Sequence, residues 1–236
     1  FKKTFDLPEQ HLIFTGDYID LGEKSFETVD LIKKYTESNK AVSLMGNHEL
    51  RFIRAMFERN NNGYMESWLI HMLPNSFENL FGTDRKFDLP HINWFDFTSN
   101  PRDNKWSEIF GEIKSNTNLR NYAKWMIQNL KLYHIDSNGT FYTHAGIPII
   151  AYTDHCDIAL EYRKVVGADA LALMERCRKI NKLDIYDPQL TKLLEGVTDK
   201  GYDYSKLTEA ARNNLFLQLG ALRMCMGHRK QNEQEF

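Results

Sequence analysis

Apolar runs and amphipathic segments alternate at the start of the chain. Residues 11–15 (HLIFT) are apolar and β-branched and stop at a Gly-Asp pair, which predicts a buried strand followed by a loop. Residues 23–37 predict an amphipathic helix, because apolar side chains recur every three residues among charges. These side chains are Phe26, Val29, Ile32 and Tyr35, with Leu31 widening the stripe. Residues 41–45 (AVSLM) predict a second strand, so the segment has the size of one βαβ crossover with parallel strands.

The pattern loosens between residues 59 and 118. Asn-, Gly- and Pro-containing breakers separate short aromatic pieces, so we predict a helical insertion here. Four tryptophans, Trp68, Trp94, Trp106 and Trp125, lie in or beside it. So many large rings favour a compact subdomain over a disordered linker. Core packing is the simplest role for the rings, and stacking on a substrate ring is the alternative.

The remainder of the chain predicts further helices and strands. Amphipathic patterns predict helices at about 119–132, 158–180 and 208–219. Strands are predicted at 140–143 (TFYT), after a DSNG turn at 136–139, and at 222–226 (LRMCM). The pattern as a whole predicts an α/β protein.

Length and charge narrow the class of protein. A chain of 236 residues fits a single domain with a sizeable core. Thirty Lys and Arg against 32 Asp and Glu give a net charge of -2, which predicts neither a nucleic-acid partner nor binding to anionic membranes. The three cysteines form no CxxC or zinc-knuckle pair.

No apolar run approaches the roughly 18 residues that a membrane span needs, which predicts a soluble protein. The first residue is Phe1 rather than Met, so a cytoplasmic protein and an exported bacterial effector both stay open. The sequence predicts no oligomeric state.

A polar motif follows each of the four predicted strands. In chain order these are GDYID at 16–20, GNHE at 46–49, HAG at 144–146 and GH at 227–228. Open α/β sheets place their sites beyond the carboxyl ends of the strands, so we expect the motifs at one edge. Their carboxylates, amide and imidazoles suit Mn²⁺, Fe and Zn²⁺, and without nearby thiolates a closed structural zinc site is disfavoured. The set predicts a catalytic metal site.

Each motif alone has a simpler interpretation. A Gly-Asp pair after a strand is often only a turn, and GNHE is compatible with a loop that caps a helix. A glycine precedes Asp17, Asn47 and His228, where it permits a sharp turn that a Cβ would obstruct. The ordered set favours a metal site over four unrelated loops.

Taken together, the motifs resemble those of a known family. GDYIDLG, GNHEL, THAGI and MGHRKQ are similar, in the same order, to motifs of the phosphoprotein phosphatase family, in its bacterial-type form, among the calcineurin-like metallophosphoesterases. The resemblance implies a fold of two mixed β-sheets packed as a sandwich and flanked by helices. It also implies two divalent metal ions, Mn²⁺ first, with Fe or Zn²⁺ as alternatives.

The resemblance assigns metal ligands residue by residue. Asp17 matches the carboxylate that bridges both ions, and Asn47, His144 and His228 match ligands of the second ion. In the family, the first ion takes its other ligands from a GDxHG motif on the preceding strand. We therefore expect that motif upstream of residue 1.

The resemblance also assigns the catalytic pair. His48 matches the general acid, and Asp20 matches the carboxylate that orients it. The implied reaction is attack on phosphorus by a hydroxide that bridges the metals, while His48 protonates the leaving oxygen.

One position departs from the family pattern. Leu21 stands where the family has an arginine that forks onto the substrate phosphate. Candidates to replace it are Arg51, Arg176 and Arg229, with Arg54 and Arg178 beside them in the sequence. Solvated helix charges are the simpler interpretation for most of these.

These features predict a phosphatase and leave its substrate open. The leading hypothesis is a protein phosphatase acting on phosphoserine or phosphothreonine and also on phosphotyrosine. A hydrolase of dinucleoside polyphosphates, or of another small phosphoester, is the alternative within enzymes. A non-catalytic scaffold of the same fold is the alternative outside them.

Overall fold

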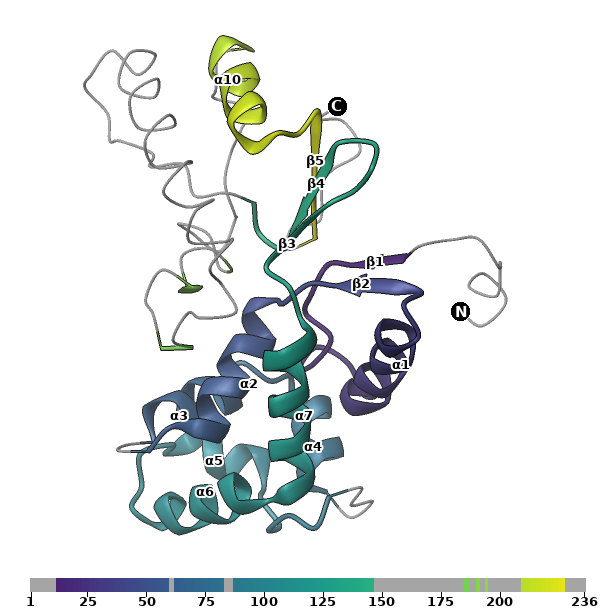
Figure 1. Cartoon of the computed structure of the whole chain (residues 1–236). Helices are drawn as coiled ribbons and strands as arrows, with labels where there is room; N and C mark the ends of the chain where they lie inside the picture. The colour runs from purple at the N-terminus through teal and green to yellow at the C-terminus, as the bar shows by residue number, and fades with distance from the viewer. Residues whose placement is uncertain are drawn as a thin grey trace, which may run out of the picture. The chain divides into compact units, whose positions relative to one another are not determined.

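The computed structural model describes residues 12–59, 62–82, 87–146, 185–186, 190–191, 194 and 209–227. The chain divides into two compact units, Phe1–Leu130 and Lys131–Phe236 (Figure 1). Within the described residues, the first unit contains a two-stranded sheet and the second a three-stranded sheet.

The described part of the first unit begins with the predicted βαβ crossover. Strand β1 (Leu12–Phe14) pairs in parallel with β2 (Ala41–Ser43), and helix α1 (Ser25–Glu37) joins them (Figure 1). Both strands are shorter than the apolar runs that predicted them. Because the strands are parallel, the loops that carry GDYID and GNHE leave the same edge of the sheet.

Helix α1 buries the stripe formed by Phe26, Val29 and Ile32. Leu31, which we expected to widen that stripe, is instead 38% exposed. With 3.6 residues per turn, position 31 lies nearly opposite Val29, so it faces away from the core.

Helix α2 (Asn47–Phe57) is buried along nearly its whole length. It packs against α3 (Gly63–Ile70), α6 (Lys105–Ser115) and α7 (Thr117–Asn129). Its apolar residues Leu50, Ile53 and Met56 recur every three residues among charged ones, which is a helical pattern. The bounds of this helix were not predicted, although this signal was present.

Helices fill the segment for which a helical insertion was predicted: α3, α4 (Pro74–Phe81), α5 (Trp94–Ser99) and α6. Buried rings form their core, with centroids 5.7 Å apart for Phe77 and Phe97 and 5.4 Å apart for Phe97 and Trp106. These rings pack in the core, as the simpler interpretation held.

Helix α7 follows at nearly the predicted position. Its N-terminus is capped by Asn116, whose side-chain oxygen accepts the N–H of Leu119 at 3.1 Å.

The second unit contains a mixed sheet. Strand β3 (Tyr133–Ile135) pairs antiparallel with β4 (Thr140–Thr143), which pairs in parallel with β5 (Arg223–Met226). The predicted turn joins β3 and β4: Asp136 Oδ1 accepts the N–H groups of Asn138 and Thr140 at 2.9 and 2.8 Å. The sequence did not predict β3, because the predicted helix ran to residue 132 and left only a few residues of mixed polarity before the turn.

Helix α10 (Glu209–Leu219) precedes β5, as predicted, whereas the helix predicted near 158–180 lies outside the described residues. The described residues thus form a mixed α/β protein with small sheets. The sandwich packing of two sheets stays a prediction, and so does the single domain with its insertion at about 59–118.

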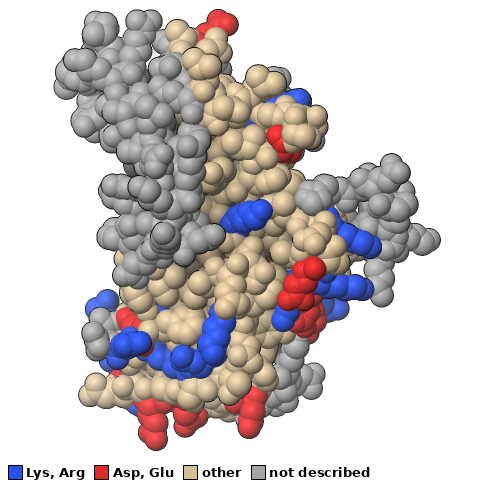
Figure 2. Space-filling model, in the orientation of Figure 1, with Lys and Arg blue, Asp and Glu red and all other residues tan. Residues whose placement is uncertain are grey.

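Among the residues that the structure describes, no helix is both long and apolar enough to cross a membrane. Figure 2 shows basic and acidic side chains scattered among uncharged ones over the described part of one face.

Candidate active site

The GDYID loop that follows β1 has an unusual backbone. Asp17 and Asp20 have φ angles of 58° and 74°, and Gly16 has a φ of 98°. Left-handed backbone is uncommon for residues with a Cβ, and such residues gather at functional sites. The loop therefore holds both aspartates in a conformation that its surroundings must impose.

The Tyr18 hydroxyl closes this loop against both strand ends. It lies 2.7 Å from the carbonyl oxygen of Leu44 and 3.0 Å from that of Phe14, and it accepts the N–H of Gly16 at 3.1 Å. A hydroxyl has one proton to donate, so the shorter contact, to Leu44, is the stronger one. The contact ties the end of β1 to the end of β2.

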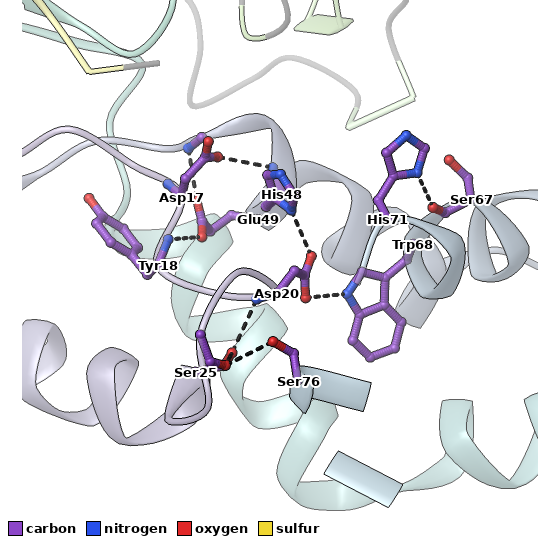
Figure 3. Close-up of polar contacts among 12 residues, drawn as sticks. Asp17, Tyr18, Asp20, Ser25, His48, Glu49, Ser67, Trp68, His71 and Ser76 are labelled. Carbon is purple, nitrogen blue, oxygen red and sulfur yellow. Dashed lines mark hydrogen bonds and ion pairs between the residues drawn. The ribbon is translucent and has the colours of Figure 1, made fainter. Parts of the chain in front are cut away.

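Glu49 joins the GDYID and GNHE loops (Figure 3). Its fully buried carboxylate accepts the N–H groups of Asp17, Tyr18 and Gly46 at 2.8, 2.7 and 2.8 Å. Burial and the charge of Asp17 raise the pKa of Glu49 to about 7, although the three N–H donors act in the opposite direction. By residue type this carboxylate is a candidate metal ligand, but in the structure both of its oxygens accept backbone N–H groups.

A signal for this role was present in the sequence. Gly46 precedes the first turn of α2, and Glu49 is the third helical residue, the position from which an acidic side chain reaches back to the N-cap N–H. The same carboxylate also reaches the other loop, which spacing along the chain does not reveal.

We expect Glu49→Gln to lower the free energy of unfolding by about 1–3 kcal/mol, because a side-chain NH₂ would replace an acceptor that faces buried N–H donors. Urea denaturation measures the loss. Exposed Glu112→Gln, on α6, serves as the control and should change stability little. Equal stabilities for the two variants would show that Glu49 does not hold the loops together.

Gly46 is required for space rather than for a left-handed turn. Its φ is -97°, which any residue adopts, but a Cβ would lie 2.3 Å from Asp17 Oδ1 and 2.4 Å from Asp17 N. The sharp turn predicted at Gly46 is therefore a close approach of the two loops, whereas Gly16 does have the left-handed φ.

Gly46→Ala should therefore destabilise the protein by about 1–3 kcal/mol, as overpacking does. Gly111→Ala, on α6, is the matched control, because a Cβ there meets nothing within 4 Å. That control should be neutral or stabilising by up to about 1 kcal/mol. Thermal melting of both variants checks the contrast, and a stable Gly46→Ala variant would contradict the close approach.

Asp20 and His48 form a buried pair (Figure 3). His48 Nδ1 lies 3.0 Å from Asp20 Oδ2, and the Trp68 indole N–H donates to Asp20 Oδ1 at 3.0 Å. Asp20 is fully buried, and 10% of the His48 side chain is exposed. The pair leaves His48 Nε2 as the ring nitrogen available for proton transfer.

Electrostatics favours a charged pair. Burial lowers the pKa of His48, but the hydrogen bond and charge of Asp20, with Asp17 and Glu49 adding to them, raise it above its usual value. Burial raises the pKa of Asp20 as well, against the hydrogen bonds from His48 and Trp68. Because the Trp68 N–H already donates to this carboxylate and the pKa of His48 is raised, we describe the pair as an imidazolium beside a carboxylate.

The proposed metal ligands of the first unit lie next to this pair. The His48 N–H lies 3.3 Å from Asp17 Oδ1, and the preceding residue, Asn47, is 4% exposed. A carboxylate and an amide are suitable donors for a divalent ion. In the described part of the chain, no three His, Cys, Asp or Glu side chains gather as a metal site by themselves. Ligands from elsewhere would be needed to complete one.

His144 lies at the end of β4 in the second unit and is buried. Its carbonyl oxygen accepts the N–H of Gly227 at 2.9 Å, so the backbone just before His228 is held against the HAG motif. His228 itself lies outside the described residues.

The arginine candidates divide into two groups. Arg51 is half-buried on α2, one turn after Asn47, while Arg176, Arg178 and Arg229 lie outside the described residues. Arg54 is not a solvated helix charge: it is 5% exposed, with its guanidinium 5.3 Å from the ring centroid of Tyr64. Leu21, at the position of the family's arginine, is 53% exposed.

The chain also matches a model of a known protein family. The model described as calcineurin-like phosphoesterase matches residues 2–171, which is more than half of the chain and includes the first three motifs.

Proposed function

Because the chain belongs to the calcineurin-like phosphoesterase family, we propose that this metallophosphoesterase is a protein phosphatase that hydrolyses phosphomonoesters of serine or threonine and of tyrosine. The observation that carries the proposal is the buried Asp20–His48 pair beside Asp17. A scaffold has no need of a buried carboxylate that orients an imidazole.

Members of this family typically bind a dinuclear metal centre. We propose Asp17 as the ligand of both ions, and Asn47, His144 and His228 as ligands of one of them, with Mn²⁺ first among the candidate metals. Their carboxylate, amide and imidazole groups fit such ions by type. When bound, the ions polarise the phosphate and make water a better nucleophile at neutral pH.

The chain's own residues supply the proton. Asp20 accepts from His48 Nδ1 and fixes both the tautomer and the orientation of the ring, so that Nε2 carries the proton to be transferred. His48 Nε2 then protonates the leaving alkoxide or phenoxide oxygen, while Asp20 stabilises the ring in its charged form. The neutral imidazole recovers its proton from water, and the products are inorganic phosphate and a free hydroxyl.

Binding of the phosphate differs from the usual family pattern, because apolar Leu21 cannot make a forked contact. We propose Arg51, Arg176 or Arg229 as the group that replaces it. Arg51 is supported by its place on α2, three residues after His48. The apolar, half-exposed Leu21 favours substrates that carry a side chain or ring beside the phosphate.

The test compares substrates in the full-length protein loaded with Mn²⁺. We expect hydrolysis of phosphoserine and phosphotyrosine peptides at a higher kcat/KM than that of a dinucleoside tetraphosphate. The opposite order would assign the site to small phosphoesters. No hydrolysis of either substrate, with metal bound, would favour the scaffold.

A further inference from the structure

We propose that Trp68, on helix α3, is a positioning residue of the active site: its indole N–H holds the carboxylate that orients His48. The inference rests on the proposed general-acid role of His48. It adds to that role by making the helical segment after α2 part of the catalytic apparatus rather than a separate packing unit.

The contact is direct and buried (Figure 3). Trp68 Nε1 lies 3.0 Å from Asp20 Oδ1, while the other carboxylate oxygen lies 3.0 Å from His48 Nδ1. Neither Trp68 nor Asp20 is exposed to solvent. The carboxylate is therefore held by one donor on each oxygen, which leaves it little freedom to rotate about its last bond.

The indole is itself fixed by packing. Its ring lies 4.9 Å from that of Phe52, centroid to centroid, and Phe52 is a buried residue of α2, the helix that begins at Asn47. A single ring thus connects α3 to α2 and presents its N–H to Asp20. Large rings with a polar atom commonly find a partner when buried, but here that partner is a proposed catalytic carboxylate.

The backbone around Asp20 is also held by the helical segment that contains Trp68. The N–H of Leu73, between α3 and α4, donates to the Asp20 carbonyl oxygen at 3.1 Å. Ser76 Oγ, on α4, donates to the Gly22 carbonyl oxygen at 2.9 Å. Ser25 adds a contact from α1, because its Oγ accepts the Asp20 N–H at 3.1 Å. Two helices of the segment therefore fix the residue whose φ is 74°.

Removal of the indole N–H should slow proton transfer in particular. In Trp68→Phe the buried Asp20 Oδ1 loses its donor, so the carboxylate can rotate and His48 is less well oriented. Hydrogen-bond partners that orient a functional side chain from behind typically contribute about 10- to 100-fold to activity. A phosphoserine peptide, whose alkoxide needs a proton, should lose that factor in kcat, whereas nitrophenyl phosphate should lose less than about 2-fold.

Trp106→Phe is the matched control. Trp106 is also a buried indole of the helical segment, but its N–H donates to the backbone oxygen of Asn100 at 2.8 Å. Like Trp68→Phe, this substitution replaces an indole by a smaller ring and removes one hydrogen bond, but it leaves the contacts of Asp20 unchanged. It should leave the ratio of the two kcat values unchanged.

An NMR measurement, which requires no catalytic turnover, accompanies the kinetics. In ¹H–¹⁵N spectra of the full-length protein, the indole signal absent from Trp68→Phe identifies Trp68. We expect this signal to move upfield in Asp20→Asn, because a neutral amide oxygen is a weaker acceptor than a carboxylate. The Trp106 signal should stay in place. The double variant Trp68→Phe/Asp20→Asn should be scarcely slower than Asp20→Asn alone.

The outcomes separate the two proposals. The loss in kcat caused by His48→Asn is expected to depend on the leaving group. If it does, but Trp68→Phe slows both substrates equally, Trp68 is only structural and the inference fails. The inference would also be overturned if the Trp68 indole signal did not move in Asp20→Asn. If the wild-type protein hydrolyses no phosphoester, the proposed function fails, and with it the catalytic meaning of a contact that the spectra can still detect.

Discussion

Replacing Asp17 with Asn is expected to lower metal-dependent phosphatase activity by at least about 10³-fold. The carboxylate is the proposed ligand of both ions, and loss of even one oxyanion-hole donor costs about 10²–10³-fold in other enzymes. The loop itself should survive, because Asn tolerates the φ of 58° at this position and its side-chain oxygen can still face the His48 N–H. Activity and bound metal, measured on the same sample, check the expectation.

The stability of the metal-free variant sharpens this test. The charge of Asp17 is one cause of the raised pKa of Glu49, so its removal relieves repulsion between two neighbouring carboxylates. Metal-free Asp17→Asn should therefore melt no lower than the wild-type protein. In the metal-free wild-type protein, the Asp17 carboxylate is therefore expected to lower stability. Such a cost is expected of a residue that is kept for function.

Asp88→Asn is the control, since it removes one exposed carboxylate of the same unit and should change neither activity nor melting. If Asp17→Asn retained both activity and metal, the assignment of Asp17 as the shared ligand would be rejected.

The βαβ crossover could be predicted because its signals are local. The stripe of Phe26, Val29 and Ile32 repeats with the helical period, and the glycines after β1 and β2 end their strands. Parallel pairing then required the two motifs to leave one edge. For the same reason Asp17, Asp20 and His48 were correctly expected to lie close together.

The surroundings of Asp20 could not be predicted in the same way. Trp68 lies 48 residues further along the chain, in a segment whose pattern indicated only an aromatic core. Its ring is indeed buried like the rings around it, and only the direction of one N–H distinguishes it. The burial of Arg54 could not be predicted either, because a charged residue on a helix is usually solvated.

The last prediction concerns the leaving group. His48→Asn should slow hydrolysis of a phosphoserine peptide by about 10²–10⁴-fold, the usual contribution of a general acid. It should leave metal content nearly unchanged, because Asp20, not a metal, is the partner of His48 Nδ1. Asp20→Asn should reproduce the effect in weaker form, since the ring remains but loses its charged partner.

Hydrolysis of aryl phosphates shows whether His48→Asn is slower because proton transfer is lost or for another reason. Nitrophenolate leaves without a proton, so its release depends on the metals and the attacking water, and His48→Asn should slow it far less than it slows the alkyl ester. A ring that only bound the phosphate would affect both esters alike, and a ring that held a metal would lower metal content along with both rates. Equal losses for the two substrates would therefore contradict the general-acid role, whereas a steep dependence on the leaving group, shared with Asp20→Asn, would locate the proton on the buried Asp20–His48 pair.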